Sequence, residues 1–391
     1  MTSKSHKKHA LLTKPKGGAF GQQELALIGA PCNIIQNLSE QLATHLKTEY
    51  GLGYADASHQ NEMAASAFRT TYTDLIGQHG VRFEHDYMAS HFRVLFNDCD
   101  LVLINGNHFL GESQMVIINE QKKASLEKKL DRLSDVKLFI LDEGVEELFP
   151  FLKTHIKNHE DIPLLSIKDV TGIGKVIKNI IDAYSIPIKG LVLAGGNSTR
   201  MGHDKGAINY HGKAHREYLA DLLNGFCSQT YLSVQNESIN FQTQYSIIPD
   251  AFLNLGPYGG ILSAFKQDPN SAWLVVATDL PLLDATTLKT LIANRDKSKM
   301  ATCFHNPETG FPEPLLTLWE PRAYPILLQF LAHGYSCPRK VLINSDIKEL
   351  PISNVDALRN VNTPEELKVV RTEGKKPIDI LNPCNFYSWL P

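Results

Sequence analysis

The sequence predicts an α/β protein with two domains, each a three-layer αβα arrangement in which helices cover both faces of a sheet. Apolar runs alternate with amphipathic runs along the chain, which is typical of alternating strands and helices. A length of 391 residues corresponds to two or three domains of ordinary size. With 43% hydrophobic residues, each half can bury a core of its own.

The individual elements follow from these runs in chain order. Short apolar runs predict strands at 25–28, 101–104, 115–118, 137–141, 190–193, 229–234, 245–248, 273–277 and 300–304. Amphipathic runs predict helices at 34–47, 125–133, 145–159, 172–184, 216–226, 259–267, 285–293, 323–333 and 364–372. The most marked break lies between Ala183 and Lys189, where a helix ends, Pro187 follows and a new strand begins. We therefore expect a tail at 1–20, a first domain at 21–185, a second at 187–372 and a tail at 373–391.

Composition excludes several classes of function. The net charge of −3 gives no reason to expect nucleic acid or an anionic membrane as a partner. The six cysteines are scattered, with no Cys-x-x-Cys pair that would suggest a zinc or redox site. The first residues are rich in Lys and His without an apolar core, unlike a secretory signal. We expect a cytoplasmic protein.

One loop carries the strongest chemical signal. The apolar strand at 190–194 runs into Gly195 and Gly196, and Arg200 and Lys205 follow. Paired glycines let backbone N–H groups approach a phosphate, and the two cations add positive charge. The loop therefore predicts a nucleoside triphosphate site. His203, His211 and His215 lie nearby, and we expect them to be surface residues rather than metal ligands.

Two carboxylates follow the loop in an order that suits this chemistry. Asp250 ends the strand before the glycine-rich turn at 256–260, and Asp279 ends the buried strand at 273–277. Ligands of open α/β sheets bind at the carboxyl edge, where one carboxylate and substrate phosphates can hold Mg²⁺. The alternative is that Asp279 caps the next helix. Further on, Asn360 and Asn362 precede a helix start whose capping box alone accounts for the pattern.

The motif order resembles the molybdenum cofactor guanylyltransferases. Their signature matches Leu193 to Gly196, then Arg200 to Gly202 and Asp204 to Gly206. The resemblance implies a Rossmann-like nucleotidyltransferase fold of the glycosyltransferase-A-like kind. It also implies Mg²⁺-dependent transfer of GMP from GTP to a molybdopterin-type cofactor, with release of pyrophosphate. Molybdoenzymes that receive the product would be the further partners.

The resemblance also assigns roles to single positions. Nucleotide contacts fall on Leu193, Ala194, Gly195, Gly196, Lys205, Gln235, Asp250 and Asp279, where Gln235 replaces the family's Asn. Arg200, Lys205 and Asp279 would be catalytic, Asp279 would bind the metal, and Asn360 and Asn362 would face the pterin. Glu313 stands before Pro314 where the family has His-Pro. Relatives that use CTP have Ala at position 195, so Gly195 favours GTP, with a missing methyl in a purine pocket as the suggested cause.

The first domain has the layout of a strand, phosphate loop and helix without the residues that make such a loop work. Ile34, Ile35 and Gln36 stand where a phosphate-binding loop needs Gly, Lys and Ser or Thr. The segments around Asn105 and Gly172 resemble the molybdopterin-guanine dinucleotide biosynthesis adaptor, whose acid is replaced by Asn105. We expect a degenerate adaptor domain without GTPase activity; an unrelated α/β domain is the alternative.

Two other functions remain open at this point. The second domain could be a cytidylyl- or sugar-phosphate nucleotidyltransferase on the same fold, or the chain could be a non-catalytic scaffold for cofactor delivery. Arg200, Lys205 and Asp279 argue against the scaffold, because a relic site would not need them.

Overall fold

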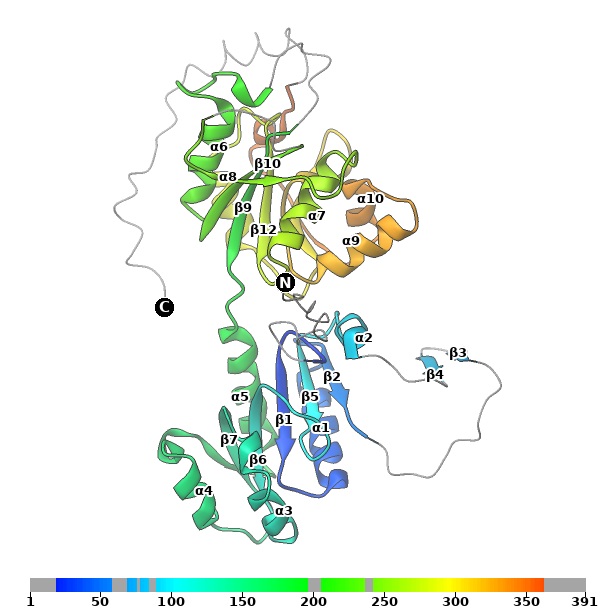
Figure 1. The fold of residues 1–391 in the computed structure, drawn as a ribbon, viewed down its shortest axis with the longest axis vertical. Helices are drawn as coiled ribbons and strands as arrows, with labels where there is room; N and C mark the ends of the chain where they lie inside the picture. The colour runs from blue at the N-terminus through cyan, green and yellow to red at the C-terminus, as the bar shows by residue number, and fades with distance from the viewer. Residues whose placement is uncertain are drawn as a thin grey trace, which may run out of the picture. The chain divides into compact units, whose positions relative to one another are not determined.

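The chain folds into two units, seen in a computed structural model that describes residues 19–57, 69–75, 78–83, 89–195, 205–235 and 242–361 (Figure 1). The first unit ends at Tyr184 and the second begins at Ser185. The division directly follows helix α5 (Val170–Ala183). Both units are mixed α/β structures, as the fold class predicted.

The first unit is built on a parallel sheet in the order β2-β5-β1-β6-β7-β8. Its strands are β1 (Glu24–Ile28), β2 (Leu52–Ala55), β5 (Leu101–Asn105), β6 (Ser113–Ile118), β7 (Val136–Leu141) and β8 (Leu164–Ser166). β1 and β5 are buried along their whole length. Such continuous apolar runs are typical of parallel strands that are covered on both faces.

Helices cover both faces of this sheet. Side chains of α1 (Cys32–Leu46) and α5 pack with one face, which includes Leu25, Leu103 and Ile117. The opposite face packs Val116 and Phe139 against α3 (Lys123–Glu127) and α4 (Pro150–His155). The arrangement is the predicted three-layer one.

Several smaller elements complete the first unit. α2 (Ala89–Leu95) lies in the chain before β5, and β3 (Thr70–Leu75) and β4 (Gln78–Phe83) form a separate antiparallel pair. Three short 3₁₀ helices, η1 (Glu120–Lys122), η2 (Leu130–Arg132) and η3 (His159–Asp161), link the longer elements.

Two predicted helices in the first unit were wrong in extent. The expected helix at 125–133 is broken into α3 and η2. The expected helix at 145–159 begins only at Pro150, which occupies the first helical position, and ends at His155. Proline disfavours helical backbone angles in the residue that precedes it, and Phe149 accordingly has extended angles, with φ at −62° and ψ at 139°.

The second unit is built on a mixed sheet in the order β11-β10-β9-β12-β14-β13-β15. Its strands are β9 (Ile188–Leu193), β10 (Gln229–Val234), β11 (Ser246–Pro249), β12 (Ala272–Ala277), β13 (Ala301–Asn306), β14 (Phe311–Trp319) and β15 (Lys348–Leu350). The four strands β11, β10, β9 and β12 are mutually parallel, so their carboxyl ends share one edge. β14 runs antiparallel between β12 and β13.

Helices again cover both faces, as Figure 1 shows. α7 (Pro257–Gln267), α9 (Ala323–Ala332) and α10 (Pro338–Ile343) pack with Trp273 and Trp319 in one core cluster. α6 (His215–Asn224) lies on the other face, where Leu223 approaches Gly190 of β9. α8 (Ala285–Ala293) contacts β13 and β14, and two 3₁₀ helices, η4 (Lys205–Ala207) and η5 (Val355–Leu358), complete the described elements.

A buried ion pair between Arg295 and Glu320 stabilises the second unit. The Arg295 guanidinium donates to both carboxylate oxygens of Glu320, at 2.6 and 2.8 Å, and to the Ile186 carbonyl at 2.9 Å. Arg295 therefore ties the start of the second unit to the end of β14. Within the described residues, no helix combines the length and hydrophobicity needed to span a membrane.

Candidate functional site

The candidate site lies along the carboxyl edge of the four parallel strands in the second unit. β9 leads into Ala194 and Gly195, β10 into Gln235, β11 into Asp250, and β12 into Asp279. These strands are hydrogen-bonded neighbours, so residues that are far apart in sequence are brought to one edge.

Gly195 lies directly against the end of β10. A methyl group on Gly195 would lie 2.7 Å from the Gln235 nitrogen and 3.0 Å from the Val234 carbon. Both neighbours are backbone atoms, so they cannot yield as a flexible side chain would. The Ala194 N–H donates to the Ser233 carbonyl at 2.9 Å and holds the loop in this register. Glycine is therefore needed at position 195 because the β10 backbone leaves no room for a methyl group. The structure thus gives a different reason for this glycine than the purine pocket suggested from the sequence.

Asp250 is a half-buried carboxyl whose surroundings favour its neutral form. Burial raises the pKa of Asp250 to about 6, against a smaller opposing effect of the Ser233 hydroxyl, which lies 3.3 Å from Oδ1. Asp250, Gln235 and Lys266 are among the residues that line a cavity of about 410 Å³. Ser233 was not expected from the sequence. The position of Ser233 near the end of an apolar strand could have indicated it, because a buried hydroxyl needs a hydrogen-bond partner.

Asp279 follows β12 by two residues, at the same edge. The helix-cap alternative is wrong, because Asp284 caps α8 by accepting a 2.7 Å hydrogen bond from the Thr287 N–H. The Val361 N–H donates to the Asp279 carbonyl at 3.0 Å, so exposed Asn360 lies beside this loop. A metal-binding candidate and a pterin-side candidate are therefore adjacent.

The histidines near this edge differ from the surface positions that we expected. His215 begins α6 and is fully buried, and its burial lowers the pKa to about 3, with a smaller effect of His211. The His211 ring stacks on Tyr218, and its Nε2 lies 3.0 Å from the Pro281 carbonyl. His211 thus joins the segment after Lys205 to the loop of Asp279. His203 lies outside the described residues.

Several expected site residues cannot be placed. Gly196, Arg200 and Asn362 lie outside the described residues, and Lys205 is described only as the first backbone position of η4. Leu193 ends β9, and its carbonyl accepts from the Thr278 hydroxyl at 3.3 Å. This contact joins the glycine loop to the chain next to Asp279.

Comparison with known proteins identifies the family. Residues 190–348 match the model of the MobA-like NTP transferase domain. A molybdenum cofactor guanylyltransferase of Xanthomonas euvesicatoria pv. vesicatoria is 30% identical over 187 residues, 46% of this chain and 92% of the relative. The chain belongs to the molybdenum cofactor guanylyltransferase family.

Two further proteins extend the comparison with molybdenum cofactor guanylyltransferases. A molybdenum cofactor biosynthesis bifunctional protein of Synechocystis sp. is 36% identical over 188 residues, 47% of this chain. The chain matches about half, 54%, of that relative's length. Molybdopterin-guanine dinucleotide biosynthesis protein A of Archaeoglobus fulgidus covers 48% of this chain and 100% of its own, with 22% identity and a TM-score of 0.42.

The expected degenerate phosphate loop lies between β1 and α1 of the first unit. Gly29, Ala30 and Pro31 link β1 to α1, and Ile34 and Ile35 lie in the first turn of that helix. Their N–H groups both donate to the Pro31 carbonyl, at 3.0 and 3.1 Å, so they are used within the helix. The resemblance of this unit to the guanylyltransferase's adaptor stays a prediction.

Proposed function

We propose that this chain transfers GMP from GTP to a molybdopterin-type cofactor and releases pyrophosphate. One observation carries the proposal: the carboxyl ends of β9, β10, β11 and β12 meet at one edge. The loop that we assign to the phosphates and two carboxylates follow these strands, and the hydrogen bond from Val361 to the Asp279 carbonyl supports the assignment of Asn360 to the same site. The relatives' names supply the substrates.

The reaction needs positioned charges more than a covalent nucleophile. A terminal phosphate oxygen of the pterin substrate attacks the α-phosphorus of GTP, and the bond to the β-phosphate oxygen breaks as pyrophosphate leaves. The N–H groups of Gly195 and Gly196 would face the triphosphate. Arg200 and Lys205 would neutralise charge that develops on its oxygens. Gln235 and Asp250 would contact the nucleoside, and Asn360 and Asn362 the pterin.

The donor chemistry at this edge fits Mg²⁺. Asp279 offers a carboxylate at a strand end, and Mg²⁺ in proteins is usually held by one or two carboxylates plus substrate phosphates and water. When bound, the ion would neutralise phosphate charge as the α-phosphorus is attacked. Asp279 would hold the ion. Two hydrogen bonds, from the Thr278 hydroxyl to the Leu193 carbonyl and from the Val361 N–H to the Asp279 carbonyl, would fix the position of the loop that carries the carboxylate.

Pyrophosphate release tests the proposal. Purified protein is incubated with Mg²⁺, molybdopterin-molybdate and one of GTP, CTP, ATP or UTP, and pyrophosphate is measured. We expect release with GTP and essentially none from Asp279→Asn, which keeps the side chain's size but removes its charge. Circular dichroism checks that the variant is folded.

The other outcomes discriminate the alternatives. Release with CTP, or only with a sugar phosphate as acceptor, would indicate one of the other nucleotidyltransferases. No release with any nucleotide would favour a scaffold for cofactor delivery. Transfer of the product to molybdoenzymes in the cytoplasm is a consequence of the same proposal.

A further inference from the structure

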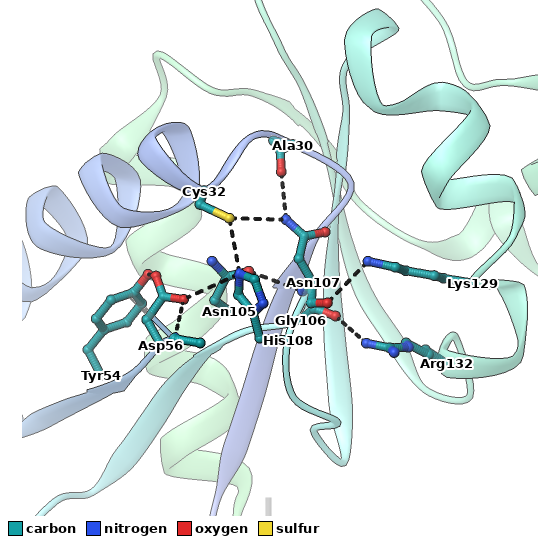
Figure 2. Close-up of polar contacts among 11 residues, drawn as sticks. Ala30, Cys32, Tyr54, Asp56, Asn105, Gly106, Asn107, His108, Lys129 and Arg132 are labelled. Atoms are coloured by element: carbon teal, nitrogen blue, oxygen red, sulfur yellow. Dashed lines mark hydrogen bonds and ion pairs between the residues drawn. The ribbon is translucent and has the colours of Figure 1, made fainter. Parts of the chain in front are cut away.

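The carboxyl edge of the first unit's sheet holds a second cluster of reactive side chains (Figure 2). Cys32 follows β1 as the first residue of α1, Asp56 follows β2, and Asn105 to His108 end and follow β5. β2, β5 and β1 are adjacent parallel strands, so these residues meet where α/β sheets commonly bind ligands. The nucleotidyltransferase site of the second unit uses none of them.

A thiol and an imidazole face each other in this cluster. Cys32 Sγ lies 3.2 Å from His108 Nε2, within hydrogen-bond reach for a sulfur partner. A nucleophile and a base at this separation are the geometric requirement for thiol catalysis. Cys32 is partly exposed, and the His108 side chain is 19% exposed, so a small electrophile can reach the pair.

A carboxylate lies near the same ring nitrogen of His108 that faces the thiol. Asp56 Oδ1 is 3.9 Å from His108 Nε2. Asp56 is itself fixed by the Tyr54 hydroxyl at 2.7 Å and by the Ala57 N–H at 2.7 Å. Burial, then the hydrogen bond to Asp56, raises the pKa of Tyr54, so this hydroxyl stays a donor. An imidazolium formed by proton transfer from Cys32 would therefore lie beside an opposite charge.

Asn105 contributes an independent sign of a ligand. Its side chain is 0% exposed, and its Oδ1 accepts from the Asn107 N–H at 3.0 Å. This bond fixes the orientation of the amide, and Nδ2 then has no hydrogen-bond partner among the described residues. Asn105 ends β5 at the same edge of the sheet as Cys32, Asp56 and His108, which Figure 2 labels together. A buried donor without an acceptor is costly, and a ligand oxygen at this place would satisfy it.

Hydrogen bonds from neighbouring segments hold the loop after β5 in place. Asn107 Nδ2 donates to the Ala30 carbonyl at 2.8 Å and joins this loop to the one after β1. Lys129 Nζ donates to the Asn107 carbonyl at 3.2 Å, and Arg132 donates to the Gly106 carbonyl at 2.9 Å. These bonds pre-organise His108 opposite Cys32, which a reactive pair requires.

We propose that Cys32 and His108 form a nucleophilic pair that accepts an acyl group from an activated ester or thioester. His108 Nε2 takes the Sγ proton, the sulfur bonds to the carbonyl carbon, and Asn105 Nδ2 donates to the carbonyl oxygen as it gains charge. The bond from carbon to the leaving group then breaks, the leaving group departs with the electron pair and takes the proton from the His108 imidazolium, and a thioester on Cys32 remains. Water hydrolyses it to the free acid and the thiol. The Asp56 carboxylate lies 3.9 Å from the nitrogen that takes the proton.

The probe for this site is p-nitrophenyl acetate, with no nucleotide or metal present. We expect release of p-nitrophenolate with an acetyl group on Cys32, located by peptide mass spectrometry. Cys337, exposed and in the other unit, is the internal control in the same sample. Cys32 should be acetylated about 10²-fold faster than Cys337, the lower end of what a positioned base contributes.

Variants separate the pair from a merely accessible thiol. His108→Asn should slow acetylation of Cys32 about 10²-fold without changing that of Cys337. Asn105→Ser should slow it less, and thermal melting shows whether each variant is folded. The proposal is overturned if Cys32 and Cys337 react at similar rates in the wild-type protein, or if His108→Asn has no effect. The wild-type comparison depends on no variant, and its result is independent of GMP transfer.

Discussion

Replacing Asp250 by Asn should stabilise the second unit at neutral pH. The folded protein raises the pKa of this carboxyl from 3.8 to about 6, chiefly by burial. A raised carboxyl pKa means that the native state binds the proton more tightly than the unfolded state, so stability falls as pH rises from 3.8 to 6. Asn removes this cost, and its Oδ1 can keep the contact with Ser233.

The magnitude follows from the same values. A rise from 3.8 to about 6, at about 1.36 kcal/mol per pH unit, sets an upper limit of about 3 kcal/mol above pH 6. Asp250 is only half-buried, and solvent screening reduces the expected gain to about 1–2 kcal/mol. At about pH 4.5 the linkage relation leaves roughly a third of the effect.

Urea unfolding followed by tryptophan fluorescence measures this difference in one unit. The three tryptophans are Trp273, Trp319 and Trp389, so the first 184 residues contain none. Asp268→Asn is the matched control of opposite sign. Burial favours a higher pKa at Asp268, but hydrogen bonds from Lys189 and Ser271 lower the pKa overall, so its Asn variant should lose stability at neutral pH. An Asp250→Asn variant that is no more stable than wild type at about pH 7.5, or a gap that does not change with pH, would refute the reasoning.

Three further predictions follow from contacts in the two units. Gly195→Ala should lower the free energy of unfolding by about 1–3 kcal/mol and weaken GTP binding, because the new methyl group would meet backbone atoms. In the control Gly225→Ala, the methyl group would lie 3.5 Å from the nearest atom, so neither the melting temperature nor the GTP affinity measured by titration should change. Asp279→Ala should show no GTP hydrolysis, because the first unit lacks a phosphate-loop lysine; phosphate release by this variant would contradict that view. Arg295→Ala should cost about 3–5 kcal/mol in urea unfolding, because it leaves Glu320, 1% exposed, without its partner; a loss under about 1 kcal/mol would argue against the buried pair.

The sequence predicted most of the parallel strands because they are apolar runs, but it missed the edge strands β2 and β8, which are only partly buried. β1, β5, β10 and β12 lie where such runs were expected, to within a residue at either end. The order of strands also brought Gly195, Asp250 and Asp279 to one edge, as the motif order had indicated. These features depend on local patterns and on the general rule for parallel sheets.

β14 could not be predicted from its sequence, because Pro312 and Pro314 argue against an inner strand. The structure accommodates both prolines. Pairing with β12 begins only at Leu316, and the ladder with β13 shifts register between Cys303 and His305. Pro314 therefore lies outside both ladders, and Pro312 pairs only with His305 of β13. This compensation lies in the partner strands, beyond the reach of a local pattern.

Other site features depend on contacts between distant segments. The pairing of Cys32 with His108 joins residues 76 positions apart, and the two share no motif. The burial of His215 is equally non-local, because a histidine at a helix start is usually exposed. Sequence patterns identified the chemistry of single loops, and tertiary packing decided which loops meet.

The hydrogen bond from Val361 to the Asp279 carbonyl has a consequence for truncation. Within the described residues, the segment between β15 and Val361 adds no strand to the sheet, yet its last residue holds the loop that carries the carboxylate. Shortening the chain to end before Val361 would leave the sheet's ladder intact and remove this hydrogen bond. Such a protein should remain folded but lose the fixed position of Asp279. Its rate of turnover should therefore fall more than its melting temperature.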